Sequence, residues 1–167
     1  IIQNIDFGIT AQTFASGTGD YTVEFEPHAT ALEEEDTGKV VASLGVESGM
    51  VPYTAFCARK SYIEKNPEII QGFTNAIQKG MDYVNSHTVD EIAETIHPQF
   101  KETELETVKT IVKRYYEQET WKGDTVFEEE SFILLQDILD EAGELSKRIS
   151  HEDLITTEFS EKALTNK

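Results

Sequence analysis

Residues 23–35 read VEFEPHATALEEE, and this stretch decides which fold class the sequence predicts. The segment Tyr21–Phe25, which overlaps the start of this stretch, alternates large apolar with polar residues. This is the period-two pattern of a half-buried strand. Pro27 then suits the first position of a helix, because the N–H that proline lacks would have no partner there. The helix is expected over Pro27–Asp36, so Glu26 is predicted to lie at a strand-to-helix corner.

Glu26 has two interpretations that the sequence leaves open. In open α/β sheets, ligands bind at the carboxyl ends of the strands, which favours a ligand contact. A carboxylate just before a helix also accepts a hydrogen bond from the first free N–H groups of that helix, which favours a capping role.

Residues 1–50 are predicted to alternate strands with short helices. The strands are expected at Gln3–Phe7, Tyr21–Phe25 and Lys39–Leu44, the helices at Thr10–Ser16 and Pro27–Asp36, and a further strand follows at Val51–Ala58. Strands that alternate with helices indicate βα units and a parallel or mixed sheet. The fold class predicted for this part is therefore α/β.

The pattern after residue 60 is helical. Asn66-Pro67-Glu68 supplies an N-cap, a proline at the first helical position and an acidic first turn, which predicts a helix to about Val84. Capping boxes begin at Thr88 and Thr103 and predict two more helices. A fourth helix is expected over Glu128–Ala142, with Gly143 as its stop. The mixed sheet is thus expected to be followed by a helical carboxyl-terminal region.

Composition and charge narrow the class of protein. The chain has 167 residues, of which 38% are hydrophobic and 28% charged, as expected for a globular domain with a core of its own. A net charge of −18 excludes nucleic acid as a partner, because phosphate binding needs clustered Lys and Arg. The lone cysteine, Cys57, has no partner for an internal disulfide and is expected to be a buried, inert thiol.

No arrangement of residues typical of an enzyme is present. The four histidines are scattered without metal-ligand spacing, and neither a phosphate-binding loop nor a serine beside a histidine base occurs. We therefore expect no enzymatic activity, no cofactor and no metal.

Three segments together resemble a known family. They are SGTGDYTVEFEPHATALEEE (residues 16–35), KVVASLG (39–45) and VPYTAFCARKSYIEKNPEIIQGFTNAIQKGMDYV (51–84), and they resemble the substrate-binding proteins of ABC importers. The branch includes nitrate-, sulfonate-, taurine- and thiamine-pyrimidine-binding members. The shared features are the Gly19-Asp20 turn, the Glu26-Pro27 corner and the Asn66-Pro67-Glu68 helix start, and the resemblance covers about residues 5–143.

The resemblance implies part of a two-lobed periplasmic-binding-protein-like fold of type II. Residues 1–50 would be the later part of the second α/β lobe, residues 51–59 a crossing strand, and residues 60–167 a helical segment that packs on the first lobe. The rest of the first lobe is absent from the chain, which we expect to be the carboxyl-terminal portion of a longer protein. Apolar surface left exposed in such a portion predicts a homodimer, an exchanged arrangement or a separate partner fragment.

The function that the resemblance implies is that of an extracytoplasmic solute-binding component, in the periplasm or as a cell-surface lipoprotein. It would deliver a small molecule to the transmembrane subunits of an ABC permease. Glu26 is the ligand-binding residue carried over from the family, with Phe25 and His28 as weaker neighbours. Residues 1–50 hold nine Asp and Glu against one Lys, which disfavours anions and favours a hydrogen-bond donor such as a thiamine-precursor-like pyrimidine or a related heteroaromatic.

Two alternatives belong to other classes of protein. The fragment could act as a helical protein-interaction module without ligand binding. An enzyme is the weaker alternative: some eukaryotic relatives make the thiamine pyrimidine with a bound cofactor, but no lysine here lies in an identifiable cofactor-attaching setting.

Overall fold

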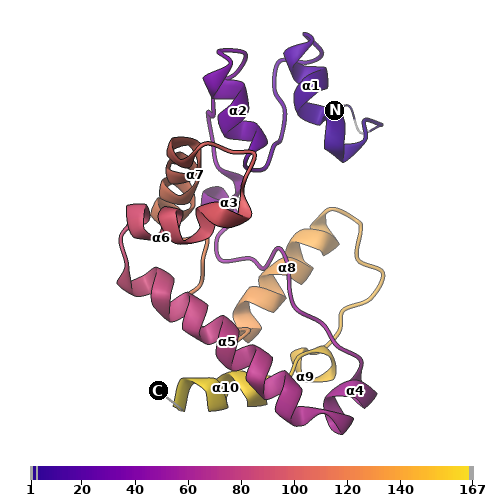
Figure 1. Ribbon diagram of the computed structural model, residues 1–167. Helices are drawn as coiled ribbons and strands as arrows, with labels where there is room; N and C mark the ends of the chain where they lie inside the picture. The colour runs from indigo at the N-terminus through magenta and orange to yellow at the C-terminus, as the bar shows by residue number, and fades with distance from the viewer. Residues whose placement is uncertain (1, 3, 166–167) are drawn as a thin grey trace. The chain divides into compact units, whose positions relative to one another are not determined.

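The computed structural model describes residue 2 and residues 4–165 of the chain, and within them it holds helices and connecting segments (Figure 1). The helices are η1 Phe7–Ile9, α1 Thr10–Ala15, α2 His28–Glu34, α3 Leu44–Glu47, α4 Lys60–Lys65, α5 Pro67–Ser86, α6 Val89–Ile96, η2 His97–Gln99, α7 Leu105–Glu117, α8 Glu129–Glu141, α9 His151–Leu154 and α10 Glu158–Thr165.

The prediction of an α/β fold with a mixed sheet, as part of a two-lobed binding-protein architecture, is wrong. No strand occurs among the described residues, and Tyr21–Phe25 and Val51–Ala58 are irregular instead. Tyr21 is 82% exposed and Val41, in the third predicted strand, is 74% exposed. Alternating apolar residues form a strand only when a neighbouring strand pairs with their backbone and a core covers one face, and the described residues supply neither here.

The first predicted strand falls partly outside the described residues, because Gln3 is not among them. The described part of that stretch leads into η1, which begins at Phe7. The third predicted strand also ends differently, since Leu44 opens α3.

The chain divides into two compact units. Unit 1 comprises residues 1–44 and 89–117. In it α6 packs against α7, and α2 contacts both α1 and α7. Its buried side chains come from these helices: Thr30, Leu32, Ile92, Ala93, Val108 and Val112.

Unit 2 comprises residues 45–88 and 118–167. Here α10 packs along α5, and α4 contacts the same helix. Gln136 of α8 exchanges two hydrogen bonds with the backbone of Ile149, at 2.8 and 3.1 Å, and so attaches α8 to the segment before α9. Among the described residues of unit 2, three buried side chains are apolar and three are polar. The apolar ones are Phe132, Phe159 and Ala163, and the polar ones are Gln78, Gln136 and Ser160.

The helical predictions are confirmed in type and approximate position. α5 begins at Pro67, and Gly143 after α8 has φ +73°, the left-handed conformation that glycine adopts most easily. The expected N-cap bond is absent, because the Asn66 amide donates to the carbonyl of Tyr62 at 3.0 Å instead. None of the described helices combines the length and the hydropathy needed to cross a bilayer.

Candidate functional site

The predicted ligand residue Glu26 lies in unit 1, where its side chain is only 4% exposed. Its Oε2 accepts a hydrogen bond from the N–H of Thr30 at 3.0 Å, and its Oε1 forms an ion pair with Nη1 of Arg114. The N–H of Glu26 itself donates to the hydroxyl of Tyr115 at 3.3 Å. The carboxylate therefore does what the capping interpretation describes, since it satisfies an N–H in the first turn of α2.

Arg114 joins two carboxylates to one guanidinium. Its Nη2 donates to Glu33 Oε2 at 2.6 Å, and its Nη1 also donates to the hydroxyl of Thr30 at 3.2 Å. Glu26, Glu33 and Arg114 are called the ion cluster from here on. It connects α2, and the corner before it, with α7.

The pKa values of Arg114 and Glu33 are both shifted in the direction that favours their charged forms. Burial alone would lower the pKa of Arg114, but hydrogen bonds and charge from Glu33 and Glu26 raise it above the ordinary value. A hydrogen bond from the N–H of Val40, at 2.9 Å, is the largest cause that lowers the pKa of Glu33, and desolvation opposes it; Arg114 lowers that pKa further.

Phe25 and His28 take different positions from Glu26. The carbonyl of Phe25 accepts the N–H of Ala29 at 3.1 Å, so this residue also takes part in the start of α2. His28 is exposed and borders a surface depression of about 150 Å³ between α1 and α2, lined mainly by alanines and by Leu32. Ligand pockets usually measure about 300–1,000 Å³, so this depression is small for a whole ligand.

The structure thus brings Glu26 to Arg114 and His28 to the depression, and Glu26 is not among the residues that line this depression. Whether Glu26, Phe25 and His28 contact a ligand stays a prediction. Sequence reasoning missed Arg114. A signal existed, because Arg114 follows Ile111 by three positions and therefore lies beside the apolar stripe of the predicted helix, where a cation needs a buried partner.

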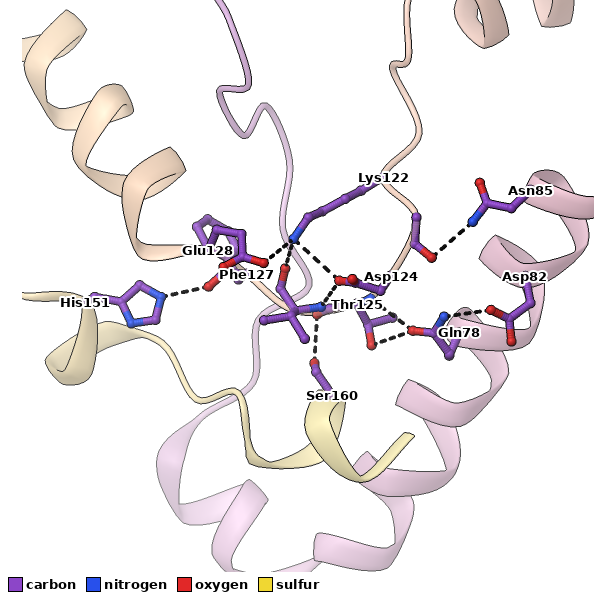
Figure 2. Close-up of polar contacts among 12 residues, drawn as sticks. Gln78, Asp82, Asn85, Lys122, Asp124, Thr125, Phe127, Glu128, His151 and Ser160 are labelled. Atoms are coloured by element: carbon purple, nitrogen blue, oxygen red, sulfur yellow. Dashed lines mark hydrogen bonds and ion pairs between the residues drawn. The ribbon is translucent and has the colours of Figure 1, made fainter. Parts of the chain in front are cut away.

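A second polar cluster lies in unit 2 and is made mostly of neutral groups (Figure 2). The amide oxygen of Gln78, a side chain only 2% exposed, accepts both the N–H and the hydroxyl of Thr125, at 3.0 and 3.1 Å. Its amide nitrogen donates to Asp82 at 3.0 Å. From α10, the hydroxyl of Ser160 donates to the carbonyl of Thr125 at 2.7 Å.

These bonds hold residues 122–127, here called the strap, against α5 and α10. Asn85 donates to the carbonyl of Gly123 at 3.1 Å, and Lys122 donates to the carbonyl of Val126 within the strap itself. At the end of the strap, the carbonyl of Phe127 accepts a hydrogen bond from Nε2 of His151 at 2.8 Å. Figure 2 shows Gln78 and Ser160 approaching Thr125 from different helices.

In the part of the chain that the structure describes, no group of three His, Cys, Asp or Glu side chains is placed to hold a metal ion. Cys57 is exposed, which contradicts the expectation of a buried thiol. The arrangement in unit 1 amounts to a pair of carboxylates that already hold a planar cation.

The chain is similar to a curated protein along its whole length. The chain is 41% identical, over all 167 residues, to a Bacillus subtilis (strain 168) protein named "Putative binding protein YtlA". The chain spans about half the length of this curated relative. No family model matches the chain, and no solved structure matches it.

Proposed function

We propose that the chain forms part of a solute-binding component of an ABC importer, which captures a small molecule and delivers it to a membrane permease. The observation that carries the proposal is the 41% identity, along the whole chain, to a protein named as a binding protein. The family resemblance of residues 16–35, 39–45 and 51–84 supplies the finer part, which is the importer and its permease. The component would act outside the cytoplasm and would carry out no chemistry.

The ion cluster supports a ligand that donates hydrogen bonds. Glu26 and Glu33 hold a guanidinium, a planar group with several N–H donors, and an aminopyrimidine or related heteroaromatic presents donors of the same kind. An anion such as nitrate or a sulfonate would meet two carboxylates there. A ligand at Glu26 has to compete with Arg114, so its apparent affinity depends on how readily that ion pair opens.

The experiment is a titration of the chain with 4-amino-5-hydroxymethyl-2-methylpyrimidine. Calorimetry measures the dissociation constant, and thermal unfolding measures how far the ligand raises the unfolding temperature. A ligand that binds only the native state must stabilise it. Glu26→Gln should weaken binding at least about tenfold, whereas Glu102→Gln, an exposed carboxylate elsewhere in unit 1, should not. Binding that is equal in wild type and Glu26→Gln would leave Glu26 with the capping role alone.

A second candidate function is a helical interaction module without a ligand. The all-helical described structure and its exposed large apolar side chains, such as Phe56 at 76% exposure, favour this candidate. The two candidates differ in one result, because a module without a ligand site would show no stabilisation by any heteroaromatic.

A further inference from the structure

Residues 48–58 of unit 2, between α3 and α4, read SGMVPYTAFCA and carry no charge, in a chain whose net charge is −18. Three large apolar side chains in this uncharged run are well exposed: Met50 at 59%, Tyr53 at 77% and Phe56 at 76%. Phe56 also meets the exposed Phe73 of α5 edge to face, at 4.9 Å between ring centroids. Exposed apolar side chains gathered on one run mark an interaction surface.

Opposite charges flank this run. Glu47 closes α3 on one side, and Arg59 and Lys60 stand on the other. Glu47 and Arg59 are exposed, and among the described residues neither takes part in an ion pair. The surface is therefore apolar in the middle, acidic at one end and basic at the other.

We propose that residues 48–58 dock, antiparallel, on the same residues of a second copy of the chain. A two-fold contact brings an equally uncharged run from the partner, so that no charge is buried in the middle. It also places Glu47 of each copy near Arg59 of the other. A parallel contact would place like charges together, which is unfavourable.

The positions of the charges indicate the register in which residues 48–58 of the two copies align. Glu47 and Arg59 each lie six residues from Tyr53, so the two-fold axis passes through Tyr53 and sets Phe56 opposite Met50 of the partner. Pro52 fits this register. When the central pair is hydrogen-bonded, the backbone N positions of residues 52 and 54 point away from the partner, where proline is tolerated. The N–H of Ala55 points toward the partner.

Sedimentation equilibrium of the chain tests the proposal, with a dimer of twice 18.8 kDa expected. Glu47→Lys and Arg59→Glu should each raise the dimer dissociation constant about tenfold or more, because each reverses two symmetric contacts. The double variant restores opposite charges and should bring the constant back near the wild-type value. Circular dichroism checks that every variant keeps its helices.

A proline pair tests the register. Ala55→Pro should abolish the dimer, since it removes an N–H that faces the partner, whereas Thr54→Pro should leave it nearly unchanged. A chain that stays monomeric at every concentration would overturn the proposal, as expected if another part of a longer polypeptide covers this surface. A dimer indifferent to the single charge reversals would overturn it too, because the contact would then lie elsewhere.

Discussion

The polar contact between α2 and α7 in unit 1 is ionic, whereas the contact between the strap and α5 in unit 2 is made by neutral hydrogen bonds. Arg114 binds two carboxylates, of which Glu26 is 4% exposed. Gln78, in contrast, satisfies the backbone and the hydroxyl of Thr125 through one amide oxygen. Both are buried polar contacts between segments distant in sequence, and they differ in the charge of their members.

That difference in charge determines how much stability is lost when one partner of each contact is removed. A charge left without its partner in a buried setting carries a large desolvation penalty, while a neutral group left without a partner carries a smaller one. An ionic contact also responds to pH, and a contact between an amide, a hydroxyl and a backbone N–H does not. We therefore expect the loss of a partner in the ion cluster to lower stability more than the loss of a partner at the strap.

Arg114→Met should destabilise unit 1 by about 3 kcal/mol, because Glu26 and Glu33 would lose the guanidinium that compensates them. The matched control is Lys113→Met, its neighbour on α7, whose exposed ion pair with Glu117 is worth only about 0.5 kcal/mol. Amide hydrogen exchange of α7 measures the loss of stability in each of the two variants. Equal effects of the two substitutions would mean that burial adds nothing to the ion cluster.

Gln78→Met keeps the size of the side chain but leaves the N–H and hydroxyl of Thr125 without their acceptor. We expect a loss of about 2 kcal/mol in the stability of unit 2, less than for Arg114→Met, because the groups of Thr125 are neutral and Asp82, which also loses a donor, is only half-buried. Lys79→Met, one position along on the exposed side of α5, should change stability little. Hydrogen exchange of α5 and α10 reports the difference, and a loss larger than that of Arg114→Met would contradict the comparison.

Acid should weaken the ion cluster through Glu33. The folded-state pKa of Glu33 is lowered below its ordinary value of 4.5, chiefly by the N–H of Val40 and then, against desolvation, by Arg114. Its contribution to stability is therefore fully present above pH 4.5 and is lost as the pH falls through the lowered pKa. In Glu33→Gln, the stability of unit 1 should change less with pH over this range than in wild type. Urea unfolding monitored at several pH values between about 3 and 6 measures this, with Glu35→Gln as the control.

Asn66→Ala should have the smallest effect, about 0.5 kcal/mol or less. A true N-cap substitution usually costs about 1 kcal/mol, but the Asn66 side chain donates to the carbonyl of Tyr62 at an exposed position and caps nothing in α5. Thermal unfolding measures the difference. A loss of a full 1 kcal/mol would mean that the side chain caps α5 in solution.

The sequence located the helices of the second half of the chain well, because their signals are local. The proline at position 67, the apolar spacing of three and four, and Gly143 as a stop all act within a few residues of the position they determine. The strands were predicted from an equally clear alternation at Tyr21–Phe25 and were wrong. Alternation describes one side of a pairing, and the backbone partner has to come from elsewhere in the chain.

The contacts of the candidate site also separate into local ones, which the sequence indicated, and long-range ones, which it did not. The sequence marked Glu26 as a residue with a role at the start of a helix, and the hydrogen bond to Thr30 agrees with the local part of that interpretation. It did not pair Glu26 with Arg114, 88 positions later, nor Gln78 with Thr125 across 47 positions. Contacts of that separation depend on how helices pack. A short pattern can mark Arg114 as a residue that needs a buried partner, but it does not say which residue that partner is.

The strongly negative charge, the helix starts and stops, and the acidic corner at Glu26-Pro27 can all be read from the sequence. The position of Arg114 at that corner, the burial of Gln78 beneath the strap, and the exposure of Tyr53 and Phe56 become visible only in the folded chain. These two groups of features differ in the range of the interactions that produce them. Caps, turns and helical spacing act between near neighbours, whereas burial and the partner of a buried charge depend on segments that meet only when the chain has folded.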